Sequence, residues 1–167
     1  MATASNSRSS NSAPPGHTPA RRTPTNSSYY DFNGVPYHEK NPNSATWMYA
    51  RDARAQQAGL PPGRQPGRKY PSPFGNGEKL ALTTPGSALS PDGPTQWLHH
   101  PLIPGTTTTC TGKGRKHLGG VRSVYTANDP NTFDVMYHNR NAGLSANGNG
   151  NFEMSKYHPA AEGQGRP

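Results

Sequence analysis

The chain contains 167 residues, of which 29% are hydrophobic, 19 are glycine and 19 are proline. This length suits one domain with tails and excludes two ordinary domains. The combined share of glycine and proline is well above the usual one, which predicts that a good part of the chain is loop or disorder. No stretch approaches the ~20 consecutive apolar residues of a membrane helix, and the recurring prolines exclude a coiled coil.

The composition is strongly basic. The formal net charge is +8, and arginine supplies 11 of the 17 basic residues. The planar guanidinium group of arginine suits phosphate oxygens. A surface with this charge favours polyanionic partners, with nucleic acid ahead of an anionic membrane. The alternative is that the charge only keeps a low-complexity chain in solution.

The single cysteine, Cys110, excludes an internal disulfide and a cysteine-based zinc site. Residues 1–28 contain no apolar core of the ~7–15 residues that a signal peptide requires. The sequence therefore predicts an intracellular protein.

The first 28 residues are mainly Ser, Thr, Asn, Pro and Ala, and we expect them to form a disordered, weakly basic arm. A short hairpin is predicted for residues 30–37, because Asn33 and Gly34 accept the positive φ angles of a tight turn. Pro36 would keep the second strand of this hairpin at a sheet edge.

A helix is predicted over residues 45–58. Ser44 can cap its free backbone N–H groups, alanine and glutamine favour its interior, and Gly59 supplies the stop. We expect this helix to pack on a sheet.

Short strands follow, separated by turns. They are predicted at residues 79–82, 96–103, 120–126 and 133–138, with a flexible basic loop at 106–117. One helix followed by several short strands predicts an α+β fold, in which one N-terminal helix packs on a small twisted antiparallel β-sheet. The domain is expected to span residues 29–157, with a flexible tail at 158–167.

Strand alternation gives the first functional indication. Arg122 shares a strand face with Val124, and His138 shares a face with Met136. If these two strands pair, one sheet face presents an arginine that neutralises phosphoryl oxygens and a histidine that transfers a proton. The alternative is that both side chains lie on a solvated strand face without chemistry.

Six short motifs, taken in their order and rough spacing, resemble those of the secreted fungal guanyl-specific ribonucleases, whose microbial ribonuclease fold is shared with ribotoxins. The resemblance covers about residues 29–157. The motifs are Ala55-Gln56-Gln57-Ala58-Gly59, Lys69-Tyr70-Pro71-Ser72-Pro73-Phe74-Gly75-Asn76-Gly77-Glu78, His99-His100-Pro101-Leu102, Gly120-Val121-Arg122-Ser123-Val124-Tyr125, Met136-Tyr137-His138 and Gly150-Asn151-Phe152.

The resemblance implies a substrate-binding segment from Tyr70 to Glu78. The family has Tyr-Pro-His, whose histidine assists the attack by the 2′-hydroxyl group, but this chain has Ser72, a poor proton acceptor. Phe74, Asn76 and Glu78 match a guanine-binding loop, in which Glu78 would accept hydrogen bonds from the guanine ring. Alternatively, Asn76 has no part in guanine binding and only stabilises a turn.

The resemblance also implies a catalytic set. His99 stands where the family has its catalytic glutamate, and it is either a general base or a drifted residue in a site no longer used for cleavage. Arg122 matches the phosphate-stabilising arginine, His138 matches the general acid, and Phe152 matches the aromatic residue beside the phosphate. His100 would face the other way in a structural role.

The implied function is cleavage of single-stranded RNA after guanosine by transesterification to a 2′,3′-cyclic phosphate, by a monomer without metal or cofactor. The family is usually secreted and disulfide-bonded, so either this chain is intracellular or a signal-encoding exon is missing. A second reading is a catalytically impaired RNA-binding pseudoenzyme, with Tyr70 or Phe74 offering stacking surfaces. A third is a protein that interacts with partners other than RNA.

Overall fold

The computed structural model describes residues 27–89, 93–111, 118–144 and 150–160. Most of the expected N-terminal arm, the cationic end of the 106–117 loop (Lys113, Arg115, Lys116 and His117) and residues 161–167 of the expected tail lie outside the described residues.

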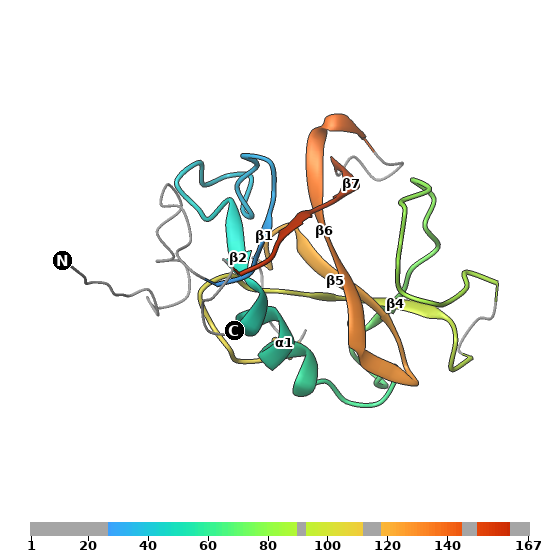
Figure 1. Ribbon diagram of the computed structural model, residues 1–167. Helices are drawn as coiled ribbons and strands as arrows, with labels where there is room; N and C mark the ends of the chain where they lie inside the picture. Colours follow the sequence, from blue (N-terminus) through green and yellow to red (C-terminus); the bar gives the residue numbers. More distant parts are fainter. Residues whose placement is uncertain (1–26, 90–92, 112–117, 145–149, 161–167) are drawn as a thin grey trace.

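The fold is α+β, with one helix and two antiparallel sheets (Figure 1). The larger sheet has the strand order β3-β4-β5-β6-β7, formed by Ser72–Pro73, Trp97–Pro101, Val121–Thr126, Asp129–Leu144 and Gly150–Met154. The smaller sheet has the order β2-β1-β8, formed by Trp47–Tyr49, Tyr29–Asp31 and Lys156–His158. Helix α1 spans Ala50–Ala58.

The sequence predicted the α+β class and three central strands correctly. Strands β4, β5 and β6 lie at the positions predicted from apolar alternation. Strand β6 extends beyond the predicted segment 133–138 at both ends, because Asp129 already pairs with Thr126 and the strand continues to pair with β7. Strands β7 and β8 were not predicted, and β8 ends at His158, one residue past the expected end of the domain.

The helix was predicted to begin at residue 45, and this start is wrong. Residues 47–49 form strand β2, whose Met48 pairs with Tyr30 of β1 and is fully buried. Burial of these apolar side chains by strand pairing outweighs local helix propensity here. Ser44 does not cap the helix, and its hydroxyl group instead accepts a hydrogen bond from the His38 backbone N–H at 3.1 Å.

Two further strand predictions are wrong. Asn33 and Gly34 do form a turn, with φ angles of 53° and 81°, but β1 pairs with β2 and β8 rather than with the segment that follows the turn. Residues 79–82 form no strand, because β3 already occupies the edge of β4. The side chains of Leu80 and Leu82 instead pack over the sheet.

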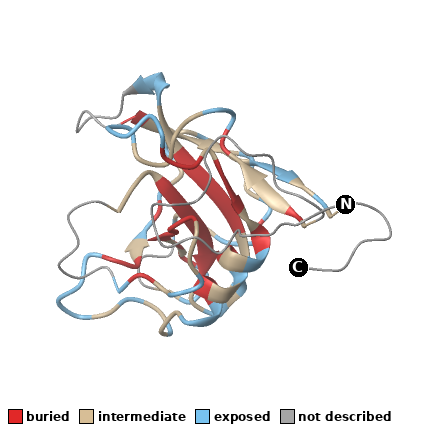
Figure 2. Ribbon diagram, turned by 90° about the vertical axis from the view of Figure 1, so that its left-hand side faces the viewer, coloured by how far each residue is buried: buried red, intermediate tan, exposed pale blue. Residues whose placement is uncertain are grey.

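One face of the larger sheet, here called the helix face, carries α1 and the main core. Leu102, Val121, Val135 and Tyr137 pack there with other buried side chains. Ser123 on this face donates a hydrogen bond to the Gln57 side chain at 2.6 Å. Buried residues run along the long central strands and toward the helix (Figure 2).

The opposite face is covered along only part of its length. Leu80 and Leu82 pack there against Phe74, Val124 and Met136. Asp134 fixes this covering segment, because its buried carboxylate accepts hydrogen bonds from the Thr83 and Thr84 backbone N–H groups at 3.0 and 2.8 Å. The other end of this face holds the polar residues considered below.

We predict that Gln56→Ala lowers the free energy of unfolding by about 2–4 kcal/mol. The buried Gln56 amide donates to the carbonyls of Ile103 and Thr106 and accepts from the Ile103 N–H. The truncation leaves these buried backbone groups without partners. Urea unfolding measures the effect, with Arg54→Ala on the exposed side of the same helix as control. Equal stability of the two variants would contradict the prediction.

Candidate functional site

Five strands contribute one residue each to a polar cluster on the opposite face. In the sheet register Ser72 pairs with His99, and His138 pairs with Phe152, while Arg122 pairs with Met136 between them. Paired residues share a face, and so do alternate residues along a strand. The larger sheet therefore brings together the residues that the sequence selected from five separate motifs.

Arg122 lies at the centre of this cluster and is only 6% exposed. Its Nη1 donates to the carbonyls of Gly119 and Val121 at 2.8 and 2.9 Å, and its Nη2 donates to the Tyr70 hydroxyl group at 3.3 Å. These partners are neutral, and among the described residues the ion pairs are Arg140–Glu39 and His158–Asp31. The Arg122 charge is thus buried without a carboxylate, and its Nε has no hydrogen-bond partner among the described residues.

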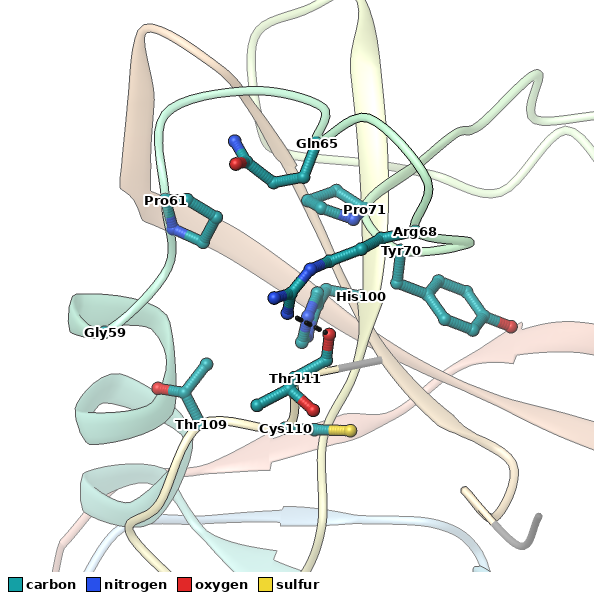
Figure 3. A pocket seen from close by; sticks show the side chains of 10 residues that line it. All are labelled: Gly59, Pro61, Gln65, Arg68, Tyr70, Pro71, His100, Thr109, Cys110 and Thr111. Carbon is teal, nitrogen blue, oxygen red and sulfur yellow. Dashed lines mark hydrogen bonds between the residues drawn. The ribbon is translucent and has the colours of Figure 1, made fainter. Parts of the chain in front are cut away.

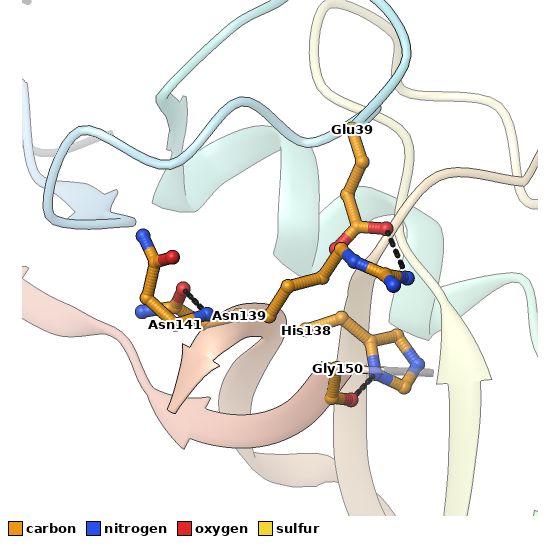
Figure 4. A network of polar contacts seen from close by, with 6 residues as sticks. Glu39, His138, Asn139, Asn141 and Gly150 are labelled. Carbon is orange, nitrogen blue, oxygen red and sulfur yellow. Dashed lines mark hydrogen bonds and ion pairs between the residues drawn. The ribbon is translucent and has the colours of Figure 1, made fainter. Parts of the chain in front are cut away.

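His138 is oriented through its Nδ1 atom. This atom lies 2.5 Å from the Gly150 carbonyl oxygen, as Figure 4 shows. Because a carbonyl oxygen only accepts hydrogen bonds, Nδ1 carries a proton and Nε2 is the atom that gains or loses one. The His138 ring also stacks on Phe152, with centroids 3.9 Å apart. The ring is therefore fixed in both orientation and tautomer.

Burial, opposed by the Gly150 hydrogen bond, lowers the pKa of His138. Arg122 lowers this pKa further, whereas Glu39 and Glu78 raise it. Glu39 lies near His138 in Figure 4 and forms an ion pair of 3.8 Å with Arg140. The neutral form of His138 is consequently favoured more than in a free imidazole.

His99 lies among aromatic rings. Its centroid is 5.5 Å from that of Tyr70, 5.7 Å from Phe74 and 6.0 Å from Phe152. Burial and then the Arg122 charge lower the pKa of His99 to about 3. His99 is therefore neutral over the physiological pH range and a weak base, and its Nδ1 is buried without a partner among the described residues.

The segment from Ser72 to Glu78 is held by its own polar contacts. The Ser72 hydroxyl group donates to the Lys69 carbonyl oxygen. The Asn76 side chain bonds both the N–H and the carbonyl of Leu80, at 2.7 and 3.1 Å, so it holds a turn. Glu78 Oε2 accepts a hydrogen bond from the Phe152 N–H at 3.0 Å, which fastens this segment to β7.

Tyr70 and Phe74 are each only 5% exposed. The stacking surfaces expected from these two rings are therefore not open in this structure, and the rings form walls around His99 instead. His100 lies on the helix face, because it pairs with Ser123. Its Nδ1 lies 3.0 Å from the Pro101 carbonyl oxygen, a contact that agrees with the structural role expected for it.

Two contributions to the cluster escaped the sequence analysis. The Tyr70 hydroxyl group contacts Arg122, which no local pattern reveals. Gly150 supplies the carbonyl that orients His138, and a Cβ at this position would lie 2.6 Å from the Arg140 backbone nitrogen. The glycine of the Gly150-Asn151-Phe152 motif was the available signal, but the reason for it is a close approach to the backbone of β6, which appears only once the two strands pair.

The chain was compared with protein-family models, curated proteins and solved structures. None matches it. The described residues contain no helix long and apolar enough to cross a membrane. The same part of the chain has no group of three or more His, Cys, Asp and Glu side chains placed to hold a metal ion.

The geometry places a buried positive charge on β5, between the strands that carry His99 and His138. A buried cation without a counter-charge favours an anionic ligand, because the ligand restores the lost electrostatic stabilisation. Arg122 can supply such a charge, neutral His99 has a nitrogen that can accept a proton, and His138 can donate one when it is protonated.

We predict that Arg122→Gln raises the pKa of both His99 and His138, since the Arg122 charge lowers both. The rise is partial, because burial remains the larger cause in each case. NMR titration of the imidazole resonances measures it, with the exposed Lys156→Gln in β8 as the charge-matched control. Spectra that retain native dispersion establish that the variant is folded, and unchanged pKa values in such a variant would contradict the prediction.

Proposed function

We propose that the chain is an RNA-binding endoribonuclease that cleaves single-stranded RNA by transesterification without a metal ion. The observation that carries the proposal is the buried, uncompensated Arg122 charge with His99 and His138 on the same sheet face. Phosphodiesters are anions whose transition state carries more charge on the phosphoryl oxygens, and a preorganised guanidinium stabilises that charge. RNA also carries its own nucleophile, the 2′-hydroxyl group, next to the phosphorus.

In the proposed reaction, His99 accepts the proton of the 2′-hydroxyl group while the 2′-oxygen forms a bond to phosphorus. The bond from phosphorus to the 5′-oxygen breaks, and His138 Nε2 gives its proton to that oxygen. The products are a 2′,3′-cyclic phosphate and a free 5′-hydroxyl group. Arg122 stabilises the phosphoryl charge throughout, and the Gly150 carbonyl keeps the acidic proton of His138 on Nε2.

Cleavage after guanosine rests on Glu78. A carboxylate has about four lone-pair directions, and the hydrogen bond from the Phe152 N–H occupies one of them. The remaining acceptor capacity fits the guanine ring N–H and amino groups, which adenine does not present together. Asn76 acts in this scheme by shaping the loop, because both ends of its side-chain amide bond Leu80.

A second candidate is RNA binding without cleavage. The observation that favours it is the Ser72 hydroxyl group, which replaces a titratable group and donates to the Lys69 carbonyl oxygen. His99, with a pKa of about 3, is also a weak base. In this case Arg122 still binds phosphate, but no rate enhancement follows.

We predict that the purified chain cleaves a short single-stranded RNA with one guanosine in the presence of a chelator, and leaves a cyclic phosphate on that guanosine. His138→Ala is expected to lower the rate by about 10²-fold or more, because it removes the general acid. The control is His158→Gln in the smaller sheet. Mass spectrometry of the products identifies the terminus and the base that precedes the cut.

Binding without product would favour the second candidate, provided that affinity falls steeply with salt. Cut sites without preference for guanosine would remove the role given to Glu78 and leave the reaction itself in place. The absence of both RNA binding and cleavage product would overturn both candidate functions.

We predict that kcat/KM is greatest in mildly acidic solution. His99 must be neutral, which holds above its pKa of about 3, and His138 must be protonated, which requires a pH below its own lowered pKa. As the pH rises through the pKa of His138, below the ordinary imidazole value of 6.5, activity falls by about tenfold per pH unit. A pH–rate profile measures this, and a rate that keeps rising up to pH 8 would contradict it.

A further inference from the structure

A cavity of about 200 Å³ lies on the helix-face side of the β3 edge. Figure 3 shows its lining, in which Pro61 and Pro71 give apolar walls, and Gln65, Thr109 and His100 provide polar groups. This lining is typical of a small-molecule subsite, where a mostly apolar surface holds a ring and a few polar groups fix its orientation. None of these residues takes part in the reaction proposed above.

The cavity lies close to the cluster but on the other side of the sheet edge. His100 lines the cavity and the adjacent His99 belongs to the cluster, because successive side chains of β4 point to opposite faces. The Tyr70 ring is directed away from the cavity in Figure 3, and its hydroxyl group reaches Arg122. One segment, residues 70–71, thus forms a wall of both sites.

Two adjacent cations connect the two sites. Lys69 Nζ lies 5.4 Å from the centroid of the Tyr70 ring, and Arg122 Cζ lies 5.3 Å from the same centroid. Arg68 lines the cavity and donates from Nη1 to the Thr111 carbonyl oxygen at 3.2 Å. Lys69 thus lies beside the ring that Arg122 also contacts, Arg68 lies at the cavity, and both Arg68 and Lys69 are exposed.

We propose that this cavity binds the nucleobase on the 5′ side of the cleaved nucleotide, with Lys69 and Arg68 holding the connecting phosphate backbone. The inference rests on the proposed function and extends it to a second subsite. The cavity volume of about 200 Å³ suits one base but not a whole nucleotide. The sugar and phosphate consequently remain at the mouth, where the two cations are.

The 5′ assignment follows from the order of the strands. His99, which takes the 2′-hydroxyl proton, lies on β4 next to β3, whereas His138, which serves the leaving group, lies on β6. The leaving nucleotide is the 3′ partner, so it departs on the β6 side. The chain on the 5′ side of the cleaved nucleotide then runs toward β3, where Lys69 and Arg68 precede Tyr70.

The test compares kcat/KM for GpA, ApGpA and GpApA. We expect the kcat/KM of ApGpA to exceed that of GpA by about tenfold or more, which is the gain expected from binding one further base and its phosphate. The kcat/KM of GpApA is expected to show no such gain. In Lys69→Gln and Arg68→Gln the ratio of ApGpA to GpA is expected to fall toward one. Arg54→Gln on helix α1 removes the same charge elsewhere and should keep the wild-type ratio.

Binding of a non-cleavable ApGpA, with 2′-deoxyguanosine at the cut position, separates the subsite from the reaction. We expect it to bind more tightly than the matching GpA analogue and to shift the NMR signals of Gln65, Thr109 and His100. Cleavage of all three substrates at equal efficiency would overturn the subsite and leave the proposed function standing. If no substrate is cleaved but the longer analogue binds more tightly and causes these shifts, the subsite is supported and the proposed ribonuclease activity is overturned. A gain from GpApA alone would overturn the 5′ assignment.

Discussion

The buried charge of Arg122 is the constraint on which the rest of the site depends. Burial of a guanidinium group without a carboxylate is costly, and here the backbone carbonyls of Gly119 and Val121 offset part of that cost. Because these acceptors are neutral, the positive charge remains uncompensated. It acts on both neighbouring histidines and lowers the pKa of each. The same charge that would favour an anionic ligand thus helps to keep His99 neutral, but it opposes the protonation of His138 that the proposed reaction requires.

The two faces of the larger sheet carry different kinds of side chain. The helix face carries the main apolar core and the amide contacts of Gln56 and Gln57, which tie α1 to the loop after β4 and to β5. The opposite face carries the charged and titratable groups at one end and a covering segment fixed by Asp134 at the other. Substitutions on one face are therefore expected to leave the other largely unaffected, as for sites without shared partners.

Local patterns in the sequence were sufficient for part of this structure. Alternation in residues 120–126 and 133–138 predicted that Arg122 and His138 share a face, and the β5–β6 register places them so. The start of the helix was not predictable in this way, since residues 47–49 become a strand only by pairing with β1. Strand β8 likewise depends on β1, a partner distant in sequence.

For the candidate site too, the sequence predicted some features, and others depend on the fold. Residue types and order were enough to select His99, Arg122, His138 and Phe152, but not their electrostatic state. The pKa of His99 depends on the aromatic rings and charges that surround it in the fold, and the tautomer of His138 depends on one carbonyl of β7. The role expected for Phe74 as a stacking surface failed for a related reason, because burial is a property of the whole fold.

The contact between Glu78 and the backbone of Phe152 has a thermodynamic consequence. Phe152 stacks on His138, so a ligand that engages Glu78 alters the surroundings of the ring that exchanges a proton. Glu78 also raises the pKa of His138 through its charge. Linkage is reciprocal: if occupancy of Glu78 changes the proton affinity of His138, then the charge state of His138 changes the affinity at Glu78 by the same factor. Ligand binding at Glu78 and proton exchange at the neighbouring His138 would therefore form a single coupled equilibrium.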